Sequence, residues 1–327
     1  WAEGLRRNKD YETLITLGMR GDGDEPMSEQ ESVALLERIV ADQRALIGEI
    51  INPNVEQVPQ VWALYKEVQG YYERGMRAPD DVTLLWCDDN WGNIRRLPTD
   101  RERERSGGAG IYYHLDYVGS PRSYKWINVS PLPKIWEQMN MAHEYGATRL
   151  WVVNVGDLKP MELPIEFFLR MAWDPQAMSK ERIRDFTLEW ARREFGPKHA
   201  DSIADIAAKY AKYNGWRKPE LLTPDTFSLV NYQEAERVLA AWRAIVLEAE
   251  RIQGDLPPEC QDAYYQLVLY PTKASATVVE MYIAAGRNRL YASQGRASAN
   301  DQADRVRKLF RQDRRLSDAY HQLAGGK

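Results

Sequence analysis

Short apolar runs alternate with helix-like segments over the first half of the chain. The helix-like segments lie at 28–50, which opens with a capping box from Ser28 to Glu31, at 66–75, and at 133–146, which ends at Gly146. Strands that alternate with helices, and that show little polar alternation, predict a parallel sheet covered on both faces. The predicted strands are residues 13–19, 60–65, 82–87, 111–115 and 149–153.

The fold class that follows is α/β, with two ways to arrange the strands. They form either the later strands of a (β/α)8 barrel or most of a doubly wound sheet. After Trp173-Asp174-Pro175 no strand signal remains, and the pattern is helical to the end, with a kink expected at Pro271. We therefore expect a partial (β/α)-barrel domain over residues 1–175 and an all-α helical bundle over residues 176–327. The predicted bundle helices are 179–195, 199–215, 231–253, 258–286 and 299–323.

Polar and aromatic residues follow every predicted strand. In a parallel barrel the strand ends meet at one face, where active sites lie, and strand ends in open sheets behave in the same way. Acids mixed with Trp and Tyr are typical of a pocket for a polar, ring-shaped ligand such as a sugar. The residues in these positions are Asp24, Glu67, Asn90, His114, Tyr117 and Asn154.

Composition adds a mild preference for sugars and removes some other partners. The chain has 11 Trp and 18 Tyr against 6 Phe, and Trp and Tyr are the rings that stack on sugars while hydrogen-bonding at their polar tips. The net charge of −4 and the scattered basic residues give no sign of a nucleic-acid partner. No apolar run approaches the length of a membrane span. Cys87 and Cys260 are far apart, and we expect two free thiols.

Several kinds of chemistry find no motif in the sequence. There is no phosphate-binding glycine loop, no nucleophile elbow and no His/Cys spacing suited to zinc, so we expect no cofactor and no metal. The glycine-rich segment Ser106 to Gly110 precedes a strand and not a helix. We interpret it as a flexible loop that closes over a pocket.

Carboxylates remain, and a pair of them is the usual minimum for glycoside hydrolysis. Glu67 follows the apolar residues 61–65, an environment that favours a protonated acid. Asp24 lies in a glycine-rich loop near Arg20, which favours the ionised form. Each of the two acids also fits an ordinary charge at a helix N-terminus.

Three further polar residues allow two interpretations. Asp88 and Asp89 follow the third predicted strand and fit either a site or the bracing of a loop. His114, at the end of the fourth predicted strand, fits either a sugar ligand or a satisfied core histidine.

Longer stretches of the chain resemble glycoside hydrolase family 115. They are LLWCDDNWGNIRRLPT, SGGAGIYYHLDYVGSPRSYKWIN and PLPKIWEQMNMAHEYGATRLWVVNVGDLKPMELPIEFF, with YKEVQGYYERGM, GMRGDGDEPM and, less closely, KPELLTPDTFSLVNYQEAE. The resemblance implies an α-glucuronidase that removes glucuronic acid or its 4-O-methyl form from xylan by an inverting mechanism. It implies a larger protein, of which this chain holds the later barrel strands and the bundle. The start at Trp1, with no Met and no signal peptide, fits a piece of such a protein.

The resemblance also assigns roles residue by residue. Glu67 in YKEVQ would be the general acid and Asp24 in GMRGDGD the base, although the two roles can be exchanged. Arg20 would bind the uronate carboxylate or orient Asp24. Arg122 and Lys125 are further candidates for that carboxylate. The expected substrate-binding residues are Arg20, Asn90 in DDNWG, His114 and Tyr117 in YYHLDY, and Asn154 in VVNVGD.

The remaining expectations concern partners and alternatives. The expected substrate is glucuronoxylan or an aldouronic acid, and the resemblance leaves open a homodimer of the full-length protein. A polymeric substrate implies a secreted or periplasmic protein. The alternative functions are a carbohydrate-binding protein without catalysis and an inactive fragment whose barrel does not close.

Overall fold

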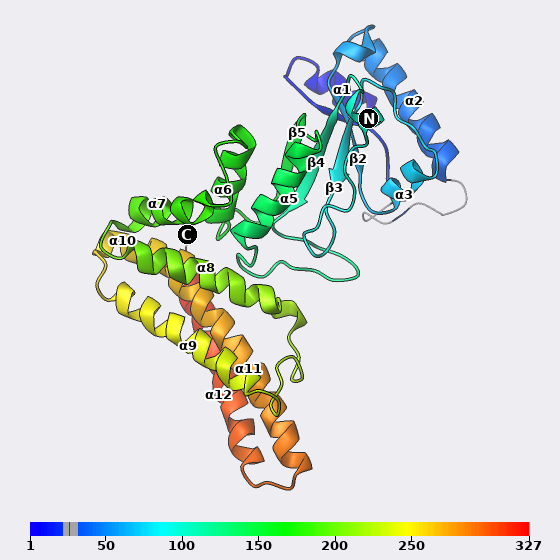
Figure 1. The fold of residues 1–327 in the computed structure, drawn as a ribbon. Coiled ribbons are helices and arrows are strands. Elements are labelled where there is room, and N and C mark those ends of the chain that lie inside the picture. The colour runs from blue at the N-terminus through cyan, green and yellow to red at the C-terminus, as the bar shows by residue number, and fades with distance from the viewer. Residues whose placement is uncertain (22–25, 27–31, 327) are drawn as a thin grey trace. The chain divides into compact units, whose positions relative to one another are not determined.

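The first half of the chain forms one parallel sheet. The computed structural model describes residues 1–21, 26 and 32–326. The sheet has five strands in the order β1-β2-β3-β4-β5, and all neighbouring strands are parallel. It curls into half of a barrel and is followed by helices (Figure 1), which confirms the predicted fold class. The strands are β1 Ile15–Thr16, β2 Gln60–Leu64, β3 Thr83–Cys87, β4 Ala109–His114 and β5 Leu150–Asn154.

A helix stands between each pair of consecutive strands, as parallel neighbours require. The connection from β3 to β4 carries only the one-turn helix α4, whose capping box joins the Thr99 and Glu102 side chains to each other's backbone N–H groups. The helices of this half are α1 Ala2–Asn8, α2 Ser32–Ile50, α3 Glu67–Glu73, α4 Asp100–Arg103 and α5 Leu132–Glu144. The predicted capping box from Ser28 to Glu31 lies outside the described residues.

Burial separates the inner strands from the last one. Nearly every residue of β2, β3 and β4 is buried, whereas every residue of β5 is only half-buried. Strands covered on both faces need apolar side chains on both, which explains why the periodicity showed so little alternation. Strand β5 lies at the edge of the sheet, where it pairs only with β4.

Strand β1 is shorter than the predicted run of residues 13–19. Its ladder ends at Thr16 because the backbone of Gly18 bonds a side chain instead. The amide of Gly18 donates to Oε1 of Gln43 at 2.9 Å, and Nε2 of Gln43 donates to the Gly18 carbonyl at 3.2 Å. A glutamine on α2 therefore replaces the strand pairing at this point.

The glycine-rich segment from Ser106 to Gly110, which we predicted to be a flexible loop over a pocket, is closely packed and runs into β4. A Cβ on Gly107 would lie 2.5 Å from the carbonyl carbon of Val82, and one on Gly110 would lie 2.2 Å from the carbonyl oxygen of Leu150. Gly110 is itself part of β4. Glycine is needed here because neighbouring backbone approaches too closely for any side chain.

The rest of the chain is helical. Helix α6 was not predicted. A π-helix at Tyr265–Leu269 precedes Pro271, where a kink was predicted, and Pro271 lies in the first turn of α11. The helices are α6 Glu162–Trp173, α7 Arg182–Phe195, α8 Ala200–Trp216, α9 Glu234–Gln253, α10 Pro258–Tyr264, α11 Tyr270–Ser293 and α12 Ala299–His321.

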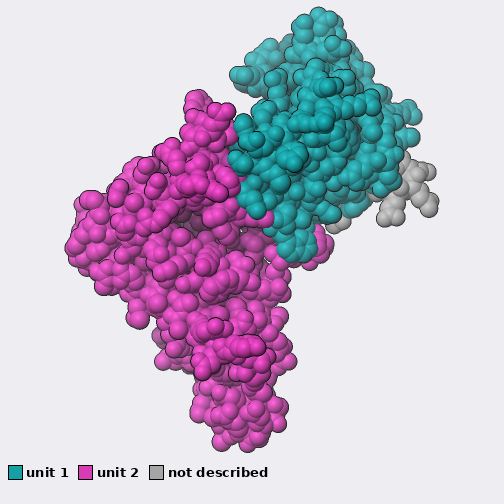
Figure 2. Space-filling view, in the orientation of Figure 1, with its two compact units in different colours: residues 1–114, 137–154 teal, residues 115–136, 155–327 magenta. Residues whose placement is uncertain are grey.

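The chain divides into two compact units, which Figure 2 colours separately. Unit 1 contains residues 1–114 and 137–154, and unit 2 contains residues 115–136 and 155–327. The sequence division at residue 175 stays a prediction. Within the described ranges, no helix combines the length and apolar character that crossing a bilayer requires.

Candidate functional site

The carboxyl ends of the strands carry most of the predicted site residues. Arg20 follows β1, Glu67 begins the helix after β2, and Asn90 lies in the turn after β3. His114 and Asn154 are the last residues of β4 and β5, and they face each other in the register of these two strands. Since the strands are parallel, all five residues lie at the same edge of the sheet in unit 1. Asp24 lies outside the described residues.

Arg20 and Glu67 form a two-pronged ion pair at this edge. Nε of Arg20 donates to Oε1 of Glu67 at 2.8 Å, and Nη2 donates to Oε2 at 3.0 Å. The exposed fractions of the two side chains are 16% and 18%, so the pair is largely covered but still reached by solvent. A guanidinium fork matches the two oxygens of a carboxylate, and the same fork would suit the carboxylate of a uronic acid.

A sharp turn places Glu67 beside Arg20. Strand β2 ends at Leu64, and Lys66 adopts φ 48° and ψ −118°, a conformation that L-residues other than Gly rarely take. Helix α3 then begins at Glu67. Strained backbone of this kind costs on the order of 1–3 kcal/mol and is concentrated at functional sites. The turn therefore supports the interpretation of Glu67 as a site residue over that of an ordinary helix N-terminal charge.

Aromatic rings link the ion pair to the ends of β4 and β5. The guanidinium of Arg20 lies 5.1 Å from the centre of the Tyr65 ring, and the Tyr65 ring lies 6.2 Å from that of His114. His114 stacks on Tyr112 at 4.7 Å, and the Tyr112 hydroxyl accepts a hydrogen bond from Nδ2 of Asn154 at 3.1 Å. Arg20, His114 and Asn154 thus belong to one continuous cluster.

Asp88 orients the His114 ring. Oδ1 of Asp88 lies 2.5 Å from Nδ1 of His114, and Oδ2 accepts a hydrogen bond from the His114 backbone amide at 3.1 Å. The exposed fractions are 7% for the His114 side chain and 0% for that of Asp88. The two contacts with Asp88 fix the orientation of the imidazole ring. His114 is therefore both a satisfied buried histidine and a candidate sugar ligand.

Burial sets the electrostatics of this second pair. Loss of solvent around the Asp88 carboxyl raises its pKa above the ordinary value, although the hydrogen bonds and charge of His114 act in the opposite direction. Asp89, the neighbouring acid, braces the turn, because its Oδ1 accepts from the amides of Trp91 at 2.9 Å and Asn93 at 3.1 Å. Asp88 therefore orients His114, and Asp89 braces the turn. Asn90, one residue further, is buried with an exposed fraction of 5%.

The sequence reasoning missed three residues of this cluster as site residues. Asp88 was left open, and Tyr65 and Tyr112 were not singled out. Each lies within two residues of a predicted site residue: Tyr65 precedes Glu67, Asp88 precedes Asn90, and Tyr112 precedes His114. Alternation along a strand sends residues i and i+2 to the same face, and this signal could have found Tyr112.

Tyr117 lies in unit 2. It pairs with Tyr124 in a small antiparallel bridge, and the two backbones exchange hydrogen bonds of 2.8 and 2.9 Å. The Tyr117 ring is buried and lies 5.6 Å from the Tyr124 ring. Arg122 and Lys125, the further candidates for carboxylate binding, lie on the same short segment of unit 2.

The cluster in unit 1 offers acid–base and hydrogen-bonding chemistry. It holds a carboxyl with a cation (Glu67 and Arg20), an oriented imidazole (His114) and an amide (Asn154), all of which suit a sugar with a carboxylate. Asp88 is fully buried and engaged by His114, so it is poorly placed to activate water. Among the residues that the structure describes, no group of three or more His, Cys, Asp or Glu side chains could hold a metal ion.

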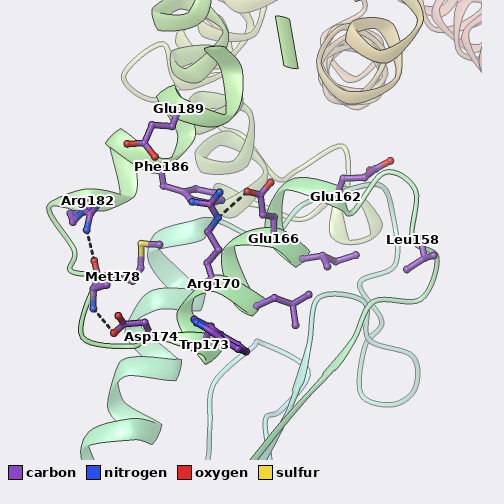
Figure 3. A pocket seen from close by; sticks show the side chains of 13 residues that line it. Leu158, Glu162, Glu166, Arg170, Trp173, Asp174, Met178, Arg182, Phe186 and Glu189 are labelled. Atoms are coloured by element: carbon purple, nitrogen blue, oxygen red, sulfur yellow. Dashed lines mark hydrogen bonds and ion pairs between the residues drawn. The ribbon is translucent and has the colours of Figure 1, made fainter. Parts of the chain in front are cut away.

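Unit 2 contains a separate cavity of about 840 Å³ between α6 and α7 (Figure 3). Its lining is mainly apolar, and an ion pair of 3.1 Å between Arg170 and Glu166 lies on one wall. The Trp173 side chain there is 92% exposed. None of the predicted site residues lines this cavity, so it is not part of the candidate site.

Comparison with known protein families supports the sequence resemblance. The family model described as glycosyl hydrolase family 115 matches residues 1–221, which is more than half of the chain and confirms the predicted family. No curated protein matches the chain.

A solved structure shares the fold along the whole chain. It is described as a family GH115 4-O-methyl-α-glucuronidase with specificity for decorated arabinogalactans. The TM-score is 0.89 with 32% sequence identity, and the match covers 100% of this chain but 44% of that chain. The chain therefore spans less than half the length of this relative.

Proposed function

Because the chain belongs to glycosyl hydrolase family 115, we propose that it carries part of the active site of an α-glucuronidase. The substrate would be α-linked glucuronic acid, or its 4-O-methyl form, on the side chains of xylan. The observation that carries the proposal is the pairing of Arg20 with Glu67 at the carboxyl edge of the sheet, at 2.8 and 3.0 Å. A uronic acid needs a cation for its carboxylate and an acid for its glycosidic oxygen, and this pair supplies one of each.

In the proposed mechanism Glu67 protonates the oxygen that leaves with the xylan chain. A second carboxylate, Asp24, activates a water molecule on the opposite face of the sugar, so that the anomeric configuration inverts. Inverting enzymes hold these two carboxyl groups roughly 6.5–9.5 Å apart, which leaves room for the water. The roles of the two acids can also be exchanged.

Arg20 would couple substrate binding to the release of the Glu67 carboxyl from its ion pair. In the structure its guanidinium fork is engaged by Glu67. A uronate carboxylate presents the same two oxygens to the same fork and would compete for it. Binding of the uronate would in this way release the Glu67 carboxyl from Arg20 and leave it available to the glycosidic oxygen.

The other residues of the cluster would hold the sugar. The proposed sugar ligands include the His114 ring, which Asp88 orients through Nδ1, and the Asn154 amide, which is hydrogen-bonded to the Tyr112 hydroxyl. Asn90 and Tyr117 complete the proposed set. Xylan is the proposed polymer, and arabinogalactan is the alternative because the structural relative is described as specific for decorated arabinogalactans. A secreted or periplasmic protein and a homodimer of the full-length chain remain part of the proposal.

A second candidate function is sugar binding without catalysis. It is favoured by the ring cluster of Tyr65, His114 and Tyr112, with centre distances of 6.2 and 4.7 Å, because such rings also serve proteins that only bind carbohydrate. The presence of Glu67 at the same edge argues against it, since a binding protein has no need for an acid beside the uronate cation.

The test is the release of glucuronic acid from glucuronoxylan, aldouronic acids and arabinogalactan side chains. We expect Glu67→Gln to lower kcat by about 10²- to 10⁴-fold, the usual contribution of a general acid. Glu73→Gln is the matched control, because Glu73 lies on the same helix with a side chain that is 49% exposed. A loss of only about tenfold in Glu67→Gln would rule out the general-acid role.

Two further measurements separate the alternatives. Calorimetric binding of glucuronic acid by the wild-type chain without any release would favour the binding protein. The absence of a cooperative melting transition by circular dichroism would favour an inactive fragment whose barrel does not close.

A further inference from the structure

A short segment of unit 2 contacts the loop of the same unit that carries Tyr117. The segment is residues 218–220, which follow α8 and run into the 3₁₀ turn Pro219–Leu221. The Lys218 ammonium lies 4.2 Å from the centre of the Tyr124 ring and donates to the Val129 carbonyl at 3.3 Å. Oε1 of Glu220 accepts a hydrogen bond from the Lys125 amide at 2.7 Å.

These contacts join parts of the chain that are far apart in sequence. The bonded residues are separated by 89 positions for Lys218 with Val129 and by 95 for Lys125 with Glu220. The ring that Lys218 covers belongs to Tyr124, which pairs with Tyr117 through both backbone hydrogen bonds and through a ring contact of 5.6 Å. Lys218 therefore contacts Tyr124, which is the bridge partner of Tyr117, a proposed substrate-binding residue.

We propose that Lys218 is a positioning residue, whose ammonium holds the Tyr117–Tyr124 bridge in the conformation that serves the uronic acid. The proposal rests on the function proposed above and adds to it a role for the helical unit. The family-model match runs through residue 221 and so includes this segment along with the barrel strands.

The charge of Lys218 is sensitive to pH. Burial of the ammonium lowers its pKa to about 8, Arg122 lowers it further by repulsion, and Glu220 acts in the opposite direction. Within the described part of the chain, the charged and aromatic groups that act on the ammonium are the Tyr124 ring, Arg122 and Glu220. The cation is present below about pH 8 and is lost above that value. Without the cation the contact with the ring face disappears, because a neutral amine lacks the attraction to the ring quadrupole.

Deprotonation of Lys218 is expected to weaken sugar binding but to raise the stability of the folded chain. The unfolded chain holds the lysine proton up to its ordinary pKa of 10.5, whereas the folded chain releases it near pH 8. Between these values the unfolded state binds more protons, so this group raises the free energy of unfolding as pH increases. A weakening of sugar binding above pH 8 would therefore not be a consequence of unfolding.

The experiment compares Lys218→Met and Lys218→Arg with Lys212→Met, a control at an exposed lysine on α8. Hydrogen exchange of the segment containing Tyr117 and Tyr124 reports the order of the bridge without any ligand. Calorimetry with glucuronic acid across the pH range reports the site. We expect Lys218→Met to exchange faster in this segment and to bind about tenfold more weakly at neutral pH. Lys218→Arg should bind normally and keep its affinity above pH 8, where the wild type loses it.

Faster exchange together with weaker binding in Lys218→Met supports the proposal. Exchange equal to that of the wild type, or unchanged affinity for glucuronic acid, would overturn it. An effect of the same size in Lys212→Met would also overturn it, because the effect would then be one of surface charge. If the wild-type chain itself fails to bind glucuronic acid while the exchange result holds, the function proposed for the site is what fails.

Discussion

The candidate site contains two acid–base pairs that differ in their access to solvent. The Arg20 and Glu67 side chains are 16% and 18% exposed and meet through two hydrogen bonds. Those of His114 and Asp88 are 7% and 0% exposed. A ligand can reach the first pair and exchange with one of its members. It cannot reach Asp88, so the second pair serves to fix a ring. Two pairs that each join a carboxylate to a basic side chain thus differ in role where they differ in burial.

The largest expected effect on stability comes from breaking the buried pair of His114 and Asp88. His114→Phe keeps a ring between Tyr112 and Tyr65 but leaves the Asp88 carboxyl without its side-chain partner. We expect the free energy of unfolding to fall by about 3 kcal/mol, because a buried polar group that loses its partner keeps its desolvation penalty. Urea unfolding of the chain measures the loss.

The control for this variant removes both partners. The double variant His114→Phe with Asp88→Leu has no buried charge left to satisfy, and it should recover a large part of the lost stability. If the double variant is less stable than the single one by a further amount of similar size, the buried pair does not act as a unit.

A smaller effect is expected from pH. Burial raises the pKa of Asp88 above its ordinary value of 3.8, so over the interval above 3.8 the folded chain holds a proton that the unfolded chain has released. Stability from this group is therefore full at low pH and falls as pH rises through the raised pKa, by at most about 1.4 kcal/mol per pH unit. Unfolding free energies measured from pH 3.8 upward should show this falling component in the wild type and not in Asp88→Asn. Equal slopes in the two proteins would contradict the raised pKa.

The smallest effect on stability is expected from breaking the ion pair of Arg20 with Glu67, which solvent reaches. Arg20→Met should lower the free energy of unfolding by about 1 kcal/mol, because a pair that solvent reaches is worth little. The same change should weaken binding of glucuronic acid by about 10- to 100-fold, since hydrogen bonds to a charged group are lost. Thermal unfolding and calorimetry measure the two quantities.

Arg44 offers a matched control for Arg20. Its ion pair with Asp81 has a distance of 2.7 Å, and both side chains are 14% exposed. Arg44→Met should therefore cost a similar amount of stability and leave sugar binding unchanged. Similar losses of sugar binding in both variants would show that Arg20 acts only through the stability of unit 1.

Much of the fold could be predicted because it depends on local pattern. Four of the five predicted strands, those at 60–65, 82–87, 111–115 and 149–153, differ from the observed strands by one or two residues at their ends. The errors have non-local causes. Strand β1 is short because Gln43 bonds the backbone of Gly18, and the glycine-rich segment is closely packed because the Leu150 carbonyl lies against Gly110. Neither cause is visible in a window of neighbouring residues.

The sequence by itself determined where polar residues would gather. Parallel strands end at one edge, so Glu67, Asn90, His114 and Asn154 were expected together before any contact was known, and Arg20 was added by the family resemblance. Only the tertiary structure decided which of them pair. Arg20 meets Glu67 across 47 positions, and Asp88 meets His114 across 26. Periodicity reports which face of a strand is buried, whereas the choice of partner depends on how separate strands lie beside one another, which is a property of the folded chain.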